Sequence, residues 1–361
     1  MAEKKSRNGT IDLFKFLMSL IVITFHFKNV VNYENEWFTK GYIAVEFFFI
    51  VSGYLFAKSL KKFENTESPL VVKSSLNFMK KKYVGFLPYH IFTCIATFIY
   101  IAVKEGWVFA DWIERIITGL PDILLIQMGG MKRVDLLGHE WYISAMLIVM
   151  FILTPIMIKH RKEYSCYIAP ALSLFLYGYL LNTYGNIDIV SKFNGHMYAG
   201  ILRALADISL GIVCFAIAES GFVEKRKKAP LLIVEILCYT FAIIYMFGKY
   251  NSALEFSITL IIAAGVTISF SEKAGLKFLN NKFVYFLGKL SFPIYLVQLL
   301  IRQFIGPIEW EYGYLSHLGV YIAATIGAAL VCMLICDLTV KLIHKIKSPK
   351  SKQTLQKNKK S

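Results

Sequence analysis

The sequence predicts an all-α integral membrane protein with about ten transmembrane helices and with both termini in the cytoplasm. Composition is the first reason: 56% of the 361 residues are hydrophobic and the mean hydropathy is +0.53, whereas soluble domains are about 45–50% apolar. The second is that apolar runs of about 20 residues, the length that crosses a bilayer, recur along the chain. The third is the placement of basic residues in alternate loops.

Ten apolar runs have the length of a span. They cover roughly residues 11–32, 41–60, 84–103, 141–158, 165–182, 200–219, 230–247, 252–271, 290–306 and 317–340. A further apolar stretch, 107–126, contains Asp111, Glu114, Arg115 and Pro121, so we expect it to be interfacial or re-entrant. The first run is too long for the apolar region of a signal peptide and lacks a small-residue cleavage site after it, so no cleaved signal is expected.

The charge pattern selects this span count and an orientation. With ten spans and an inner N-terminus, the inner segments and the C-terminal tail hold 29 of the 40 lysines and arginines, counting Lys58 and Lys341 at the span edges. Cytoplasmic loops are enriched in basic residues, so both ends are predicted to lie inside. An eleventh span at 107–126 would place every later loop on the opposite side of the membrane. The net charge of +16 is therefore interpreted as membrane orientation rather than nucleic-acid binding.

Two units are predicted along the chain. Residues 1–343 form a membrane domain, and 344–361 form a basic tail expected to be disordered and to lie against anionic lipid. The six cysteines lie within apolar runs and show no CxxC spacing. They are interpreted as small packing residues, so neither a disulfide framework nor a metal site is expected.

Titratable residues inside a span are candidates for a functional site because they are costly to bury in hydrocarbon. In "IDLFKFLMSLIVITFHF" (11–27), His26 lies about 9 Å below the outer end of the first span, at 1.5 Å per residue. Glu46 lies about 8 Å below the outer end of the second span. Because consecutive spans are usually neighbours, the two are predicted to form a base and its supporting carboxylate.

Further polar residues reach a similar level on other spans. They are His139 and Glu140 beside Trp141, then Arg203, Gln298 and Arg302. Together they predict a polar cavity that opens outward, with His26 near its floor. Arg302 has the alternative of extending its side chain to the membrane surface.

Lys15 lies on the same helical face as His26. Eleven residues at 100° each end about 20° past three full turns, so the two positions are about 16 Å apart along the axis. Anchoring at the membrane interface is the simple interpretation of Lys15. The functional one is a cation for the phosphates of a cytosolic ligand whose long arm reaches His26, as a phosphopantetheine arm would.

Five stretches, in order, resemble motifs of the acyltransferase 3 family of membrane acyltransferases. They are "GTIDLFKFLMSLIVITFH", "GYIAVEFFFIVSGYLFAKSL", "KKKYVGFLP", "HEWYISAMLIV" and "LSFPIYLVQ". The second is the most specific, because it is similar to the family's G-x-x-x-V-[DE]-x-F-F-x-x-S-G-[FY] segment. Four positions depart from the usual pattern: Lys15 replaces an Arg, Gly85 an Arg, Met146 a Glu and Gln298 a late His. Lysine keeps the charge of Arg but not its bidentate geometry.

The resemblance implies a ten-helix O-acyltransferase of the bacterial plasma membrane that takes part in polysaccharide O-acetylation. The implied donor is cytoplasmic acyl-CoA, with acetyl-CoA expected, acting as a co-substrate and not as a bound cofactor. The implied acceptor is a hydroxyl of an envelope polysaccharide or lipid-linked sugar. His26 is the implied base, supported by Glu46, and Lys15 and Lys82 are expected to bind the donor.

The remaining candidate residues are assigned to substrate binding or to an oxyanion hole. They are Ser52, Gly53, Trp141, Arg203, Tyr295 and Gln298, with Arg203 or a backbone N–H near Ser52 and Gly53 as the oxyanion donor. Two alternatives stay open. One is a transporter or flippase for a glycan or lipid-linked sugar, for which the inverted repeat or paired broken helices are not evident. The other is a sensory membrane domain without chemistry.

Overall fold

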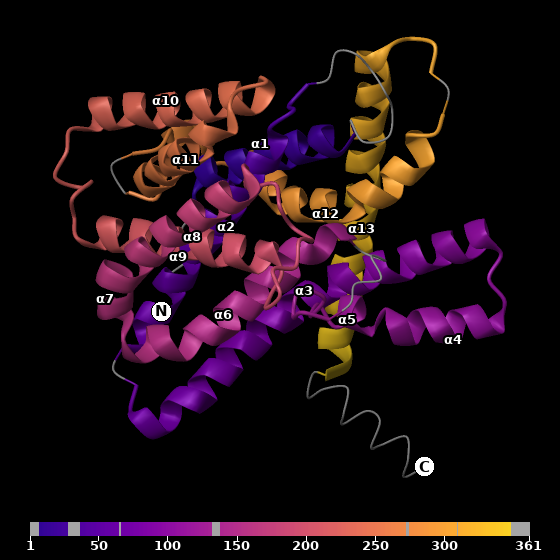
Figure 1. Ribbon diagram of the computed structural model, residues 1–361, viewed down its shortest axis with the longest axis horizontal. Helices are drawn as coiled ribbons and strands as arrows, with labels where there is room; N and C mark the ends of the chain where they lie inside the picture. Colours follow the sequence, from indigo (N-terminus) through magenta and orange to yellow (C-terminus); the bar gives the residue numbers. More distant parts are fainter. Residues whose placement is uncertain are drawn as a thin grey trace.

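The computed structural model describes residues 7–27, 37–64, 66–131, 138–271, 274–308 and 310–347. Within these ranges the chain is helical and contains no β-strand. Ten of the described helices are long and apolar enough to cross a membrane, which confirms the predicted all-α membrane fold (Figure 1).

The helices follow one another with short connections. Their bounds are α1 Gly9–Phe27, η1 Gly41–Ile43, α2 Ala44–Leu60, η2 Lys61–Phe63, α3 Ser68–Glu105, α4 Phe109–Thr118, α5 Leu120–Ile123, η3 Gly138–Glu140, α6 Trp141–Lys159, α7 Arg161–Glu163, the π-helix η4 Tyr164–Ile168, α8 Ala169–Tyr184, α9 Ala199–Glu219, α10 Lys228–Phe247, η5 Ser252–Leu254, α11 Glu255–Ser269, η6 Lys277–Leu279, α12 Lys282–Ile305 and α13 Tyr314–Lys347.

Two helices are longer than predicted. α3 has 38 residues and is therefore about 57 Å long, because it begins at Ser68 inside the predicted inner loop 61–83. Pro69 in its first turn suits a helix start, and Gly106 ends it with a φ of 65°. α13 continues to Lys347, four residues into the predicted tail. The predicted end of the first span, 28–32, and the tail from 348 lie outside the described residues.

The stretch 107–126 does not form a spanning helix. It forms α4, with 10 residues or about 15 Å, and the single turn α5. None of the residues of α4 is buried. Figure 1 shows α4 at the right-hand edge, folded back beside the end of α3. This agrees with the predicted interfacial or re-entrant segment.

The centre of the bundle is the close packing of α2 against α9. A Cβ added to Gly53 would lie 2.3 Å from the carbonyl oxygen of Ile208, and one added to Gly211 would lie 2.2 Å from that of Ile50. Only glycine permits such contact between two helix backbones, as is common in membrane helix pairs. α2, which carries Glu46, is thereby fixed against α9, which carries Arg203.

A second close contact joins α1 to α12 and α13. A Cβ on Gly288 would lie 2.4 Å from the Cβ of Asp12, so α12 touches the first turn of α1. At the other end of α1, the ring of Phe27 stacks on that of Tyr321 with centroids 5.0 Å apart. This contact sets His26, next to Phe27, against α12 and α13.

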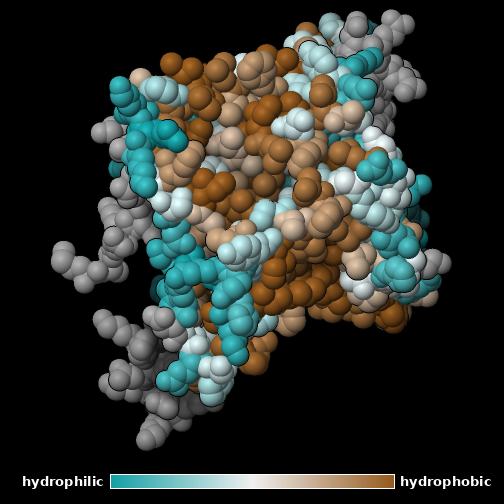
Figure 2. All heavy atoms as spheres, turned by 60° about the vertical axis from the view of Figure 1, so that its left-hand side comes forward, coloured by the Kyte–Doolittle hydropathy of each residue, from teal (hydrophilic) through white to brown (hydrophobic). Residues whose placement is uncertain are grey.

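The outer surface carries the apolar side chains expected of lipid-facing helices. Figure 2 shows a broad hydrophobic area bounded by hydrophilic rims on its left and right sides. Large exposed residues such as Val103, Phe151 and Phe175 belong to membrane-spanning helices. The chain is therefore a multi-pass membrane protein.

Candidate active site

His26 lies in the last turn of α1, where its ring contacts α12. The ring atom Nδ1 is 3.0 Å from Oε1 of Gln298. The amide nitrogen of Gln298 donates to the carbonyl oxygen of Tyr295 at 3.1 Å, so exchanging the amide O and N would place two oxygens in contact. Oε1 therefore faces His26 as an acceptor, and Nδ1 must carry the proton. The structure thus assigns the Nδ1–H tautomer to a neutral His26 and leaves the lone pair on Nε2.

The backbone around this pair is held by α12 and α13. Nη1 of Arg302 donates to the carbonyl oxygen of His26 at 3.1 Å, near the end of α1 where helix carbonyls lack partners. The hydroxyl of Tyr321 donates to the carbonyl oxygen of Gln298 at 3.1 Å. Arg302 therefore contacts the backbone of His26, and because its side chain is partly exposed, the alternative that it extends to the membrane surface stays open.

Glu46 is fully buried and its partner is Arg203. Nε of Arg203 lies 2.9 and 3.1 Å from the two carboxylate oxygens of Glu46, and Nη2 lies 2.8 Å from Oε1. Nη2 also donates to the carbonyl oxygen of Tyr42 at 2.8 Å. The guanidinium lies 5.4 Å from the centroid of the Trp141 ring, which adds a cation–π contact.

The predicted pairing of His26 with Glu46 is therefore corrected. No hydrogen bond joins these two described residues; Glu46 bonds to Arg203, and Gln298 takes the place expected of Glu46 beside His26. Counting residues from the span ends gives the depth of His26 and Glu46 along the membrane normal. It did not fix the direction in which each side chain leaves its helix.

A second carboxyl group lies next to Glu46. Asp207, one turn after Arg203 on α9, is also fully buried and interacts with Glu46, and it accepts a hydrogen bond from the hydroxyl of Tyr177. Two carboxyl groups thus lie near one guanidinium inside the bundle, and within the described residues the ion pair of Arg203 is with Glu46. Burial of unpaired charge is costly, so this cluster ties α2, α8 and α9 together.

Ser52 and Gly53 lie in the middle of α2. Their backbone N–H groups belong to the helix interior and bond to carbonyls four residues earlier, so neither is available for an oxyanion, and that predicted role is corrected. Gly53 serves the packing against α9. The hydroxyl of Ser52 lies 3.2 Å from that of Tyr142, whose ring centroid is 5.8 Å from that of Tyr295.

The two predicted donor-binding lysines lie in different settings. Nζ of Lys15 is 3.7 Å from a carboxylate oxygen of Asp12, and its side chain is one-quarter exposed. Lys82 is half-buried on α3, and within the described part of the chain it forms no hydrogen bond or ion pair. Both lysines belong to helices that pack into the bundle. We interpret their aliphatic stems as packed along these helices, with the ammonium groups near an end of a span.

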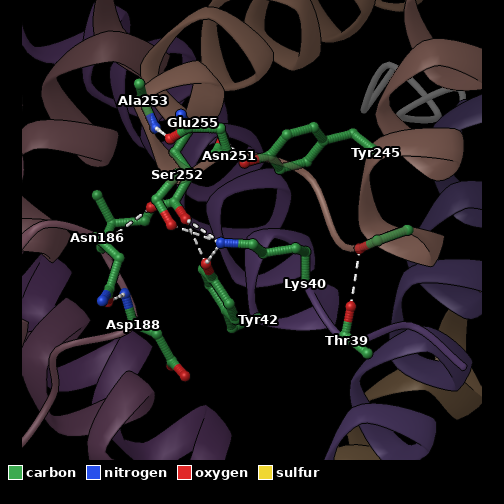
Figure 3. Close-up of polar contacts among 12 residues, drawn as sticks. Thr39, Lys40, Tyr42, Asn186, Asp188, Tyr245, Asn251, Ser252, Ala253 and Glu255 are labelled. Atoms are coloured by element: carbon green, nitrogen blue, oxygen red, sulfur yellow. Dashed lines mark hydrogen bonds and ion pairs between the residues drawn. The ribbon is translucent and has the colours of Figure 1, made fainter. Parts of the chain in front are cut away.

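Lys40 forms a polar clamp, defined here as Lys40, Tyr42, Ser252 and Glu255, at the end of the bundle near the start of α2 and of α11. Nζ of Lys40 lies 2.6 Å from Oγ of Ser252 and 3.1 Å from Glu255, and the hydroxyl of Tyr42 also donates to Glu255. Figure 3 shows the lysine reaching between these partners. Because the other Glu255 oxygen accepts from the backbone N–H of Ile187 at 2.7 Å, the clamp is fully bonded and joins three loops.

A cleft of about 320 Å³ lies at the opposite end of the bundle. It is lined by residues of α7, η4 and α9 and by the residues that directly follow η2 and α9: Glu64, Arg161, Lys162, Ser165, Cys166, Ala216, Glu219 and Ser220. Nη1 of Arg161 is 2.5 Å from Glu219 and Nη2 is 2.9 Å from Glu64. The hydrogen bond from Arg161 lowers the pKa of the Glu64 carboxyl. We interpret this cleft as the edge of an ion-pair network that connects the ends of three helices.

The family of the chain is established by comparison with known sequences. The profile of a family described as an acyltransferase domain matches residues 8–337, nearly the whole chain. The chain belongs to the acyltransferase 3 family. It is thus a membrane acyltransferase, as the five motifs predict. No curated protein and no solved structure was found to match it.

The departures of this acyltransferase from the usual family pattern have different structural settings. Gln298 bonds to His26, so the position of the usual late His remains inside the candidate site. Met146 is 2% exposed and packs in the core of the bundle, where the usual Glu would be buried. A Cβ on Gly85 would meet no atom within 4 Å, so that position is open to larger side chains.

Four residues of this acyltransferase were not predicted from the sequence. Asp207 carried a usable signal, since it is a charge inside a predicted span. Tyr142 and Tyr321 carried none, because tyrosines are frequent in the apolar runs of this chain. His90 is the fourth, and it belongs to a separate cluster of buried polar groups.

Proposed function

We propose that this chain transfers an acyl group, acetyl in the first place, from cytoplasmic acyl-CoA to a hydroxyl of an envelope polysaccharide or lipid-linked sugar. His26 acts as the general base. The family membership supports acyl transfer, and the contact of His26 with Gln298 is the observation that supports this residue as the base. An amide oxygen on Nδ1 keeps Nε2 unprotonated and oriented, as a general base requires.

The proton that leaves the acceptor hydroxyl ends on coenzyme A. Nε2 of His26 takes the proton of the acceptor hydroxyl as its oxygen attacks the thioester carbonyl carbon. The carbon–sulfur bond then breaks, and the imidazolium returns the proton to the thiolate of the leaving coenzyme A. The products are the acyl ester and free coenzyme A.

The donor enters from the side on which α1 begins. Its phosphates meet Lys15 and Lys82, which carry the charge that anionic groups require. Lys15 is eleven residues before His26 on α1, about 16 Å along the axis, which matches the reach of a pantetheine arm. Lys82 precedes the predicted span 84–103 by two residues, at the end that the charge pattern predicts to be cytoplasmic. A ligand phosphate would compete with Asp12 for Lys15.

The proposed function is tested with acetyl-CoA labelled in the acetyl group. Purified protein in vesicles, supplied with the labelled donor and with an envelope fraction as acceptor, should transfer label to base-labile ester. A transporter or flippase would leave the donor intact and the acceptor unlabelled. Intact labelled acetyl-CoA after prolonged incubation would contradict the proposal.

Replacing Gln298 tests how His26 is oriented. Gln298→Leu removes the acceptor for the Nδ1 proton, so we expect the transfer rate to fall about tenfold or more, in line with the loss of one buried hydrogen bond. Gln298→Glu is the matched control, because its carboxylate accepts the same proton and should keep most of the rate. Initial rates at saturating donor measure both. Equal rates for the Leu variant and the wild-type protein would show that Gln298 does not orient the base.

A further inference from the structure

Apart from His26, whose partner is an amide, His90 is a fully buried histidine with a carboxyl partner. Nδ1 of His90 on α3 lies 2.5 Å from Oε2 of Glu140 in η3, and Nε2 lies 2.8 Å from the carbonyl oxygen of Ile123. His90 and Glu140 are both 0% exposed. The other carboxyl oxygen of Glu140, Oε1, is buried and has no hydrogen-bond partner.

The partners of His90 determine whether Oε1 of Glu140 can donate or accept a hydrogen bond. Nε2 faces a carbonyl oxygen and must carry a proton. Nδ1 then either donates to a Glu140 carboxylate or accepts from a protonated Oε2. Burial raises the pKa of Glu140, and the contact with His90 opposes the rise. In both protonation states Oε1 is an acceptor only, so its missing partner is a hydrogen-bond donor.

A second buried polar side chain without partners, Gln127, lies four residues after Ile123, whose carbonyl contacts His90. Gln127 is 0% exposed, and neither its amide nitrogen nor its amide oxygen has a hydrogen-bond partner. The segment 123–128 is held at one end by His90, through Ile123, and at the other by Oγ of Ser144, which accepts from the Met128 N–H at 3.1 Å. Ser144 lies one turn after Glu140.

The backbone between the two attachment points is strained. Leu125 has a φ of 56°, a value that branched side chains rarely adopt and that concentrates at functional positions. Three buried polar atoms without partners within one short region are unusual, because buried polar groups are nearly always hydrogen-bonded. Together these features indicate a site whose ligand supplies the missing hydrogen bonds.

The three atoms specify the chemistry of the ligand. Glu140 Oε1 and Gln127 Oε1 need donors, whereas Gln127 Nε2 needs an acceptor. Neighbouring hydroxyl groups provide both, and an anion provides no donor. The site also adjoins the candidate active site, because Glu140 interacts electrostatically with Tyr295 and the carbonyl of Tyr295 accepts from Gln298.

We propose that Gln127, Glu140 and His90 form a binding site for the hydroxyl groups of a carbohydrate acceptor. This inference rests on the proposed function, since it identifies where the acceptor sugar is held beside His26. The sugar enters when the segment 123–128 releases its two hydrogen bonds.

Thermal unfolding with a defined sugar tests the binding site without relying on activity. Methyl β-glucoside is the probe, and betaine, a stabilising solute without hydroxyls, is its control. Relative to betaine, the sugar should raise the unfolding midpoint of the wild-type protein by about 2 °C or more. Gln127→Leu should abolish this rise, while its midpoint without sugar stays equal to or above that of the wild type, because an unsatisfied amide is replaced by an apolar group.

A matched control is Ser173→Ala on α8, which removes another buried polar atom without a partner and should keep the sugar-dependent rise. No rise in the wild-type protein would overturn the proposal. So would an unchanged sugar-dependent rise in Gln127→Leu, and so would a lowered midpoint of that variant without sugar, which would mean that buried water satisfies the amide.

Acetyl transfer to the same sugar separates the two proposals. If the proposed function holds, the KM for methyl β-glucoside should increase about tenfold or more in Gln127→Leu. A sugar-dependent rise that the variant loses, without transfer by the wild-type protein, would contradict acyl transfer and support the binding site. Transfer with the same KM in both proteins would support acyl transfer and overturn the binding site.

Discussion

Replacing His26 with alanine is expected to reduce acyl transfer by about 10²-fold or more. The reason is that a positioned general base contributes about 10²–10⁴-fold to such a reaction, and alanine leaves no group beside Gln298 to take the acceptor proton. The measurement is the amount of base-labile acetyl ester in envelope material from cells that lack the chromosomal copy and express the variant.

His196→Ala is the matched control, because that histidine is exposed in the loop between α8 and α9 and should have no effect. Both variants must reach the membrane in equal amounts, as judged by immunoblot. Normal ester content in cells that express the His26 variant would exclude His26 as the base.

Replacing Arg203 with methionine is expected to destabilise the bundle by about 3–5 kcal/mol, the cost of leaving one member of a buried ion pair without its partner. Glu46 is fully buried, and the hydrogen bond of Arg203 to the carbonyl oxygen of Tyr42 would also be lost. The measurement is the thermal unfolding of purified protein in lipid nanodiscs.

The double variant Glu46→Gln with Arg203→Met is the control for this second prediction. It removes the uncompensated charge and should recover a large part of the lost stability. Arg203 is also one of the two alternative oxyanion donors predicted from the sequence. If Arg203→Met folds with wild-type stability and loses only transfer, that assignment is correct and the structural role is not.

The fold was predictable because hydrophobic length and charge placement are properties of the sequence alone. Ten apolar runs correspond to ten long helices, and the charge-containing apolar stretch 107–126 was correctly separated from them. The start of α3 and the end of α13 were not predicted. The basic residues around Lys73 and Lys82 favoured an inner loop in the prediction. A lysine-rich segment with regularly spaced apolar residues can equally form an amphipathic helix.

The site was predictable only in part. Motif spacing identified His26, Glu46 and Gln298, but not which of them touch. Residue counting gives depth along a helix axis, whereas contact also depends on how the helices are rotated and packed. The close approach of α2 to α9 at Gly53 and Gly211 turns Glu46 toward Arg203. The packing of α1 on α12 brings His26 to Gln298, which is 272 positions later.

The central claim is that His26 removes the proton of an acceptor hydroxyl during acyl transfer. The most direct test is a comparison of purified wild-type protein and the His26→Ala variant in identical vesicles, supplied with acetyl-CoA labelled in the acetyl group and with the same acceptor fraction. We expect labelled ester from the wild-type protein and about 10²-fold less, or none, from the variant. Formation of labelled ester at equal rates by the two proteins would contradict the account.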